Sequence, residues 1–410
     1  MSQPSLARRL GTGDAVVVGL AAMLGAGVFV AFGPAAEAAG SGLFVGLGIA
    51  AVVAFCNATS SAQLAAVHPS SGGTYLFGRV VLGPWWGFLA GWGFVIGKTA
   101  SCAAMAMAAA AYAVPVDGWP QRVAAALVVV AFTAANLRGV TRTAALARVL
   151  LVVTLIVLVG FVALCWASGP TRVPLPLESG GGVLGVLQAA GLLFFAFAGY
   201  ARIATLAEEV RRPEILGRAI LLALGTAVVL YLAVGLTLVA VLGAELPGAH
   251  TPVAAATAAV GAVWAEPVVR VGATAASLGA LLALLAGVSR TTLAMARERD
   301  LPGWLDSVSE RHRVPDRAEL LVGAVVVALV LVVDLRGAIG FSSFGVLLYY
   351  FVANTAALRQ PAGERRWPRA LQVLGMAGCL LLAVTLPVGS VLVGLVVLAL
   401  GIVGRAIGRR

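Results

Sequence analysis

Apolar runs of about 20 residues, the length that an α-helix needs to cross a bilayer, recur along this chain and constrain its fold more than any other feature. Of the 410 residues, 61% are hydrophobic and 11% are charged, and the mean hydropathy is +1.01. These values lie far outside the composition of soluble domains, and the short alternating segments of a membrane β-barrel are absent. We therefore predict an all-α integral membrane protein without a separate soluble domain.

About twelve transmembrane helices account for the apolar runs, since each run has roughly the length that a bilayer requires. The expected spans are residues 14–36, 42–66, 84–112, 122–136, a fifth span that ends near 168, and then 183–206, 217–242, 268–297, 318–333, 337–358, 370–385 and 388–404. Between the seventh and eighth spans, the short apolar stretch 253–263 predicts a surface helix in an outer loop.

The chain carries 28 Lys and Arg residues and a formal net charge of +11. Most of these residues fall in loops that share the side of the N-terminus when that terminus is placed in the cytoplasm. This distribution follows the positive-inside rule, so we expect a multi-pass protein of the cytoplasmic membrane with both termini in the cytoplasm. The positive charge is thereby explained without a nucleic-acid partner, and the polar N-terminus leads into a full-length span rather than a cleavable signal peptide.

Two glycines interrupt the first span at its midpoint, where Gly25 and Gly27 flank Ala26. Glycine in a helix interior costs about 1 kcal/mol relative to alanine, and an opened backbone in lipid costs more, so such a break is tolerated where the helix lines a cavity. Free N–H groups near Ala26 would suit a carboxylate, and free carbonyl groups near Met23 and Leu24 would suit an amine or a cation. The alternative is that both glycines only allow close helix packing.

A second break is expected in the span 183–206, where Gly199 follows a run of aromatic and small residues. The two broken spans open two blocks of five helices, 14–168 and 183–358, and the odd number of spans inverts the second block; two further helices occupy 370–404. Matching interruptions in inverted halves indicate the binding site of a secondary transporter. A carboxylate on the amide groups of Ala26 and Gly27 and an amine on the carbonyl groups of Phe197 and Ala198 would bridge the two breaks and describe a receptor for a zwitterionic amino acid. The candidate substrate-binding residues are Met23, Gly25, Ala26, Gly27, Phe197, Ala198, Gly199 and Tyr200.

Four segments resemble the amino acid–polyamine–organocation (APC) superfamily: residues 25–29, 69–75, 194–213 and 297–302. The resemblance spans essentially the whole chain. It implies the five-plus-five inverted-repeat fold of the bacterial leucine transporter type, alternating access, and proton-coupled symport or exchange of amino acids or amines. The chain departs from the family at two positions. Many members carry a lysine midway along the fifth helix, where this chain has Thr154, and an acidic position after the second break is Ala201 here, next to Arg202.

Lys98 is the only lysine of the chain, and it lies near the middle of the expected span 84–112. A lysine that has left water can release its proton near neutral pH, whereas an arginine keeps its charge. Lys98 is therefore a candidate for proton coupling in place of the missing lysine of the fifth helix, or for a counter-charge to an acidic substrate. The alternative is a structural lysine held by backbone carbonyl groups.

The remaining candidates each have a structural alternative. Arg202, Glu208 and Glu209 are expected to form an inner salt-bridge network or gate rather than to bind substrate, while the aromatic rings of Phe197 and Tyr200 would gate the site or simply fill space. Thr154 and Ser289 would offer hydroxyl oxygens to a sodium ion.

The four cysteines lie in apolar runs without a paired motif, so we expect no disulfide bond and no metal site. The sequence also contains no recognisable catalytic or cofactor-binding motif, and we do not expect an enzyme. The leading hypothesis is a proton-coupled secondary transporter of amino acids or related small amines and metabolites. The alternatives are a proton-independent exchanger or exporter with the same fold, and a membrane sensor or partner subunit that does not transport.

Overall fold

The computed structural model describes residues 11–68, 72–139, 144–169, 180–200 and 215–408. Every regular element in these ranges is a helix. The α-helices of the first part are α1 (Thr12–Met23), α2 (Gly27–Val30), α3 (Phe32–Ala39), α4 (Leu43–Val67), α5 (Gly73–Val81), α6 (Pro84–Ala113), α7 (Trp119–Leu137) and α8 (Ala144–Ala167). The later ones are α9 (Gly182–Phe197), α11 (Ile215–Leu242), α12 (Pro252–Ala259), α13 (Glu266–Arg297), α14 (Asp316–Val332), α15 (Leu335–Arg359), α16 (Arg369–Thr385) and α17 (Val388–Gly408). Short 3-10 turns are η1 (Gly243–Glu245), η2 (Val263–Ala265), η3 (Gly303–Leu305) and η4 (Ala362–Glu364).

Nine helical segments of the described ranges are long and apolar enough to cross a membrane. They comprise α1 with α2, then α4, α6, α7, α8, α11, α13, α15 and α17, and the shorter helices α9 and α16 are also apolar. The prediction of a multi-helix membrane protein is confirmed at this level.

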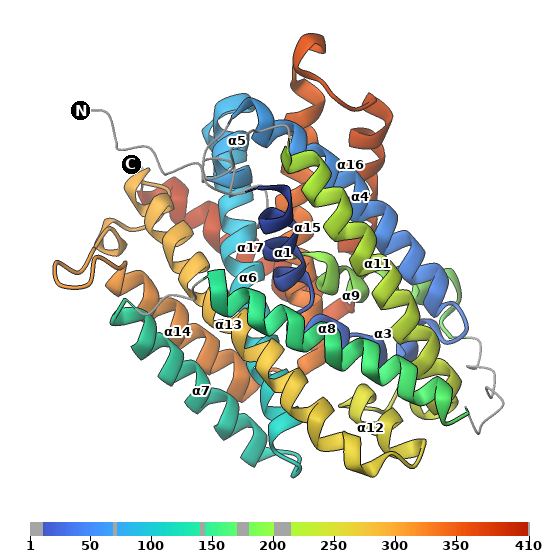
Figure 1. The fold of residues 1–410 in the computed structure, drawn as a ribbon. Helices are drawn as coiled ribbons and strands as arrows, with labels where there is room; N and C mark the ends of the chain where they lie inside the picture. The colour runs from blue at the N-terminus through green and yellow to red at the C-terminus, as the bar shows by residue number, and fades with distance from the viewer. Residues whose placement is uncertain (1–10, 69–71, 140–143, 170–179, 201–214, 409–410) are drawn as a thin grey trace.

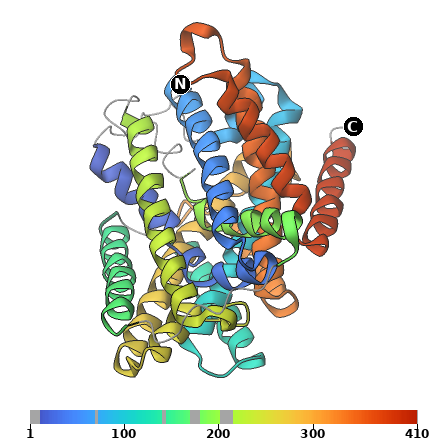
Figure 2. The same ribbon diagram turned by 90° about the vertical axis from the view of Figure 1, so that its right-hand side faces the viewer.

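The bundle has buried central helices and lipid-facing peripheral ones (Figures 1 and 2). In an 18-residue apolar stretch of each helix, 83% of the residues of α6 are buried but only 11% of those of α17. α17 lies at the edge of the molecule in Figure 2. α5 marks one end of the bundle and α12 the other (Figure 1), and we call these the α5 end and the α12 end.

Local sequence sets the starts of the long helices. Proline occupies the first turn of α6, α7, α12 and α13, where its missing N–H group has no intrahelical partner to lose. Gly83 precedes α6 with a φ of 107°, a conformation that favours glycine. This turn lets α5 fold back on α6, against which it packs.

Small residues bring α6 and α15 into close contact. A Cβ atom on Gly97 would lie 2.9 Å from the carbonyl oxygen of Ser342, and one on Gly93 would lie 2.8 Å from that of Gly345. The hydroxyl groups of Ser101 and Ser342 are 2.6 Å apart across the same interface. Glycine and serine at such positions allow helix backbones to approach closely in membranes, and this contact fixes the rotation of α6 about its axis.

Three sequence expectations need correction. The predicted surface helix is α12, and five of its eight residues are buried because it packs against α8, α11 and α13. The first span has a second interruption at Ala31, between α2 and α3. Residues 73–75, which we expect at the end of a cytoplasmic loop over 68–75, belong instead to α5, whose apolar residues pack on α6.

Candidate functional site

The first break lies where the glycines predicted it. α1 ends at Met23, and the N–H group of Leu24 donates to the carbonyl oxygen of Leu20 at 2.7 Å. Helical structure resumes at Gly27, so the chain leaves the helix at residues 24–26. All residues from Met23 to Phe32 are buried. The interruption is thus inside the protein, as the cost of an open backbone in lipid requires.

The second break also occurs at its predicted position. α9 ends at Phe197, and Ala198, Gly199 and Tyr200 continue as a non-helical turn. Phe197 and Tyr200 are fully buried. Arg202, Glu208 and Glu209, the predicted inner network, lie outside the described residues, and their roles stay predictions.

Glycines bring the two breaks into direct contact. A Cβ atom on Gly27 would lie 2.6 Å from the Cα atom of Ala196, closer than side chains are found to approach. A Cβ atom on Gly199 would overlap the backbone of Ala22 and Met23. Hence the two glycines allow the end of α1 and the end of α9 to meet backbone to backbone.

Tyr231 of α11 joins the two breaks. Its hydroxyl group lies 2.8 Å from the carbonyl oxygen of Met23 and 2.9 Å from that of Ala196. Its ring packs on Phe197 with centroids 4.9 Å apart. Sequence reasoning missed this residue, although one signal was present: Tyr231 is the only aromatic residue of α11.

Lys98 reaches the second break from α6. Its side chain is buried, with 8% of the residue exposed, and its ammonium group donates to the carbonyl oxygen of Ala198 at 3.1 Å. Ala198 carries one of the carbonyl groups that we expect to accept from a substrate amine. The structure therefore brings two of the predicted site residues together, with the protein's own ammonium as the donor.

One face of α6 meets both breaks. Met105 is seven residues beyond Lys98, and its methyl group would be 3.9 Å from a Cβ atom on Gly25. Tyr112 is seven residues further, and its hydroxyl group donates to the carbonyl oxygen of Phe29 at 2.9 Å. Positions seven apart share a face of a helix, so this periodicity could have extended the prediction from Lys98 to Met105 and Tyr112.

A cluster of buried polar side chains lies beside the second break, where the ring of Tyr200 stacks on Tyr350 with centroids 5.0 Å apart. Asn354, one turn beyond Tyr350, donates to the amide oxygen of Asn57 at 2.6 Å and accepts from Ser60 at 2.7 Å. These side chains tie α4 to α15. The sequence signal was the presence of two asparagines inside apolar spans.

The hydroxyl groups proposed for a sodium ion bond to their own helices. Thr154 donates to the carbonyl oxygen of Leu150 at 2.8 Å, and Ser289 donates to that of Leu285 at 2.9 Å. Each hydroxyl thus satisfies its helix one turn earlier, which is an ordinary role for Ser and Thr in apolar helices. Among the described residues, no group of His, Cys, Asp or Glu side chains is arranged to hold a metal ion.

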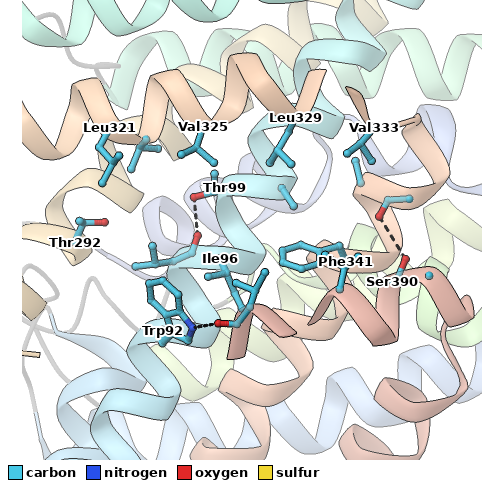
Figure 3. Close-up of a pocket in the computed structure, with 18 of the residues that line it drawn as sticks. Trp92, Ile96, Thr99, Thr292, Leu321, Val325, Leu329, Val333, Phe341 and Ser390 are labelled. Carbon is cyan, nitrogen blue, oxygen red and sulfur yellow. Dashed lines mark hydrogen bonds between the residues drawn. The ribbon is translucent and has the colours of Figure 1, made fainter. Parts of the chain in front are cut away.

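A separate cavity of about 730 Å³ opens between α6, α14, α15 and α17 (Figure 3). Its wall is mainly apolar, with Leu321, Val325, Leu329 and Phe341 facing the space in Figure 3. Two threonines in the wall donate to carbonyl groups of their own helices, Thr99 to Val95 at 2.7 Å and Thr292 to Val288 at 2.9 Å. None of the described residues of either break lines this cavity. It is therefore a lateral groove distinct from the candidate site.

Charged side chains gather at the α5 end around Asp300, which is buried. Its carboxylate accepts from Arg405 at 2.8 Å, from Arg79 at 3.1 Å and from the hydroxyl group of Tyr75 at 2.9 Å. The guanidinium group of Arg405 also lies 4.2 Å from the ring centre of Trp85. We call Tyr75, Arg79, Asp300 and Arg405 the Asp300 cluster. It ties α5 and the segment after α13 to α17.

Burial and the neighbouring carboxylate of Asp300 raise the pKa of Tyr75 above its ordinary value of 10.0. The phenol therefore stays protonated and remains a hydrogen-bond donor to Asp300 over the whole neutral range. The sequence motif 297–302 drew attention to this segment but gave no partner for its carboxylate.

Comparison with known proteins identifies relatives over the whole length. A family model described as amino acid permease matches residues 10–410. An uncharacterised transporter of Mycobacterium tuberculosis is 54% identical over 409 residues, which cover 98% of this chain and 92% of that protein. The branched-chain amino acid permease BcaP of Bacillus subtilis is 26% identical over 400 residues, covering 91% of this chain and 85% of the permease. The methylthioribose transporter of the same species is 28% identical over 382 residues, covering 86% and 81%.

Proposed function

Because this chain belongs to the amino acid permease family, we propose that it moves amino acids or related small amines and metabolites by proton-coupled secondary active transport. It is a multi-pass membrane transporter of that family. The finer architecture we propose is an inverted repeat of 14–168 and 183–358, with two further spans in 370–404. In this arrangement the chain lies in the cytoplasmic membrane with both termini in the cytoplasm, and it works by alternating access.

The observation that carries this proposal is the meeting of the two helix breaks in the protein interior. Backbone opened at residues 24–26 and 198–200 presents polar groups away from lipid, as in transporters that bind their substrate between broken helices. Tyr231 and the contact between Gly27 and Ala196 hold the breaks together. A movement of one repeat against the other would change these contacts and alternate the access.

The position of Lys98 supports proton coupling, because its titratable ammonium group contacts the helix break that we expect to move during transport. Its ammonium group is bonded to Ala198 in the second break. When a buried lysine releases its proton it also loses the charge that attracts it to a carbonyl oxygen. Proton binding and the position of the break are then linked, which is what coupling requires.

The names of the relatives support a range of small substrates. BcaP is named for branched-chain amino acids, and another relative is named for methylthioribose. Relatives of this chain are thus named for more than one class of solute, and the side chains around the breaks would determine which class is bound.

The test is uptake by proteoliposomes that contain the purified protein, with radiolabelled amino acids, amines and related metabolites and with an acidic outside buffer. We expect one chemical class to accumulate and a protonophore to abolish the accumulation. Lys98→Met should abolish the pH-driven uptake, whereas Thr99→Val, whose hydroxyl group bonds its own helix beside the lateral groove, should retain it. Exchange of preloaded substrate without pH dependence would favour the exchanger, and no movement of any compound would contradict transport.

A further inference from the structure

Lys98 occupies a position that a substrate amine would need. The carbonyl group of Ala198 follows the last residue of α9, a position where carbonyl groups commonly lack an intrahelical donor. The ammonium group of Lys98 donates to this oxygen at 3.1 Å. A zwitterionic amino acid would bring a second ammonium group to the same oxygen, and the two like charges would repel each other.

The positive charge of Lys98 has no carboxylate partner among the residues that the structure describes. Every ion pair between those residues is made by an arginine. The neighbouring polar groups on α6 are the thiol of Cys102, the hydroxyl group of Thr99, which donates to Val95, and the hydroxyl group of Ser101, which is paired with Ser342. A buried ammonium needs an anion close by, and the carboxylate of a bound solute would meet this need.

The donors of Lys98 match a particular kind of anion. An ammonium group has three N–H donors, and one of them is used by Ala198. Two donors remain on one nitrogen. A carboxylate with an oxygen atom on the adjacent carbon presents two acceptors at suitable spacing, so it would use both donors and cancel the charge.

A second polar group, the hydroxyl group of Ser277, lies on the side of the first break that faces α13. A Cβ atom on Gly25 would lie 2.9 Å from the side chain of Ala280 in α13, and Ser277 is on the same face of α13, three residues earlier. The hydroxyl group of Ser277 is buried without a hydrogen-bond partner among the described residues. It offers an additional donor on the α13 side of the break.

We infer that the transported solute is a small 2-hydroxy or 2-oxo carboxylate, the counterpart of an amino acid in which an oxygen atom replaces the ammonium group. Lys98 supplies the ammonium group that such a solute lacks, and it binds the carboxylate and the neighbouring oxygen while it keeps its bond to Ala198. This inference rests on the proposed function, because it assigns the substrate class of the same site.

The experiment compares matched pairs of compounds on the purified protein in lipid nanodiscs. The pairs are leucine with 4-methyl-2-oxopentanoate, alanine with lactate, and glycine with glycolate. Thermal unfolding at increasing compound concentration gives the Kd, because a ligand that binds the folded state raises its stability. For at least one pair we expect the oxygen analogue to bind about ten-fold or more tightly than the amino acid.

Two variants then test whether Lys98 causes the tighter binding of the oxygen analogue. Lys98→Met should remove the tight binding of the oxygen analogue, and Thr99→Val, one residue further on α6, should leave it unchanged. The comparison of pairs on the unmodified protein remains decisive even if Lys98→Met does not fold.

The outcomes separate this inference from transport itself. An amino acid that binds as tightly as its oxygen analogue and enters proteoliposomes would overturn the inference and support the proposed function. Tight binding of an analogue that never crosses the membrane would support the binding of such a carboxylate at Lys98 but overturn both transport and the inference that this solute is the one transported. Binding of neither member of any pair would also overturn the inference.

Discussion

The hydroxyl group of Tyr231 donates a hydrogen bond of 2.8 Å to the carbonyl oxygen of Met23, the last residue of α1. The same oxygen of Tyr231 lies 2.9 Å from the carbonyl group of Ala196 in α9. One side chain of α11 therefore contacts the end of each broken segment, and the two ends keep a fixed relative position as long as this contact lasts.

Tyr231→Phe keeps the ring on Phe197 but removes the hydroxyl group. The one hydroxyl proton that the two buried carbonyl groups share is then lost, for which we expect a loss of about 1–3 kcal/mol in the free energy of unfolding and slower uptake. Thr226→Val is the matched control, since this exposed hydroxyl on the same helix bonds only Leu222. Denaturant unfolding and initial uptake rates measure both effects, and equal behaviour of the two variants would contradict the role of Tyr231.

Gly27→Ala should damage transport because the added methyl group meets the Cα atom of Ala196. Overpacking of this kind costs about 1–3 kcal/mol, and here it also separates the two breaks. Gly160→Ala is the control, since a Cβ atom there meets nothing within 4 Å. We expect uptake to fall only in Gly27→Ala. If both variants transport normally, the backbone contact at Gly27 is not needed for the cycle.

Asp300→Asn should destabilise the protein strongly. The side chains of Asp300 and Arg405 are both fully buried, and loss of one partner leaves a buried charge, at a cost of about 3–5 kcal/mol. Asp306→Asn removes the partner of Arg297 in an exposed pair, for which we expect less than about 1 kcal/mol. Thermal unfolding of both variants in the same detergent gives the comparison, and similar melting temperatures would refute the structural importance of the Asp300 cluster.

Tyr75 should make stability fall at high pH. Its pKa is raised in the folded protein by burial and by Asp300, so above pH 10 the unfolded chain loses the phenol proton while the folded protein keeps it. The contribution of Tyr75 is therefore complete below the unfolded pKa and is lost as the pH rises beyond it, by up to about 1.4 kcal/mol per pH unit. Tyr75→Phe should show a shallower decline than the unmodified protein above pH 10, and parallel stability curves would contradict this explanation.

Local sequence predicted the features that depend on a single helix. The breaks at Gly25–Gly27 and after Phe197 were predicted from glycine position and apolar context, and both occur there. The superfamily resemblance is confirmed by the match over residues 10–410. The roles of Thr154, Ser289 and Lys98 stay predictions, as does the inverted arrangement of the two repeats.

Contacts between residues far apart in the sequence could not be predicted from the local sequence. Tyr231 is 208 positions from Met23, and no helical periodicity connects them. The partner of Lys98 depends on the rotation of α6, which the close approach of Gly97 and Ser342 sets. These relationships come from how helices cross, and a single sequence contains no direct record of a crossing.

The bond between Arg405 and Asp300 has a consequence for the order of biosynthesis. The two residues are 105 positions apart, so at about 5–20 residues per second the aspartate is made roughly 5–20 s before its arginine. Tyr75 and Arg79 are made earlier still and can meet Asp300 first. The Asp300 cluster is then completed by the arrival of α17, and the newly made transporter reaches its mature state at the α5 end only after that last helix has entered the membrane.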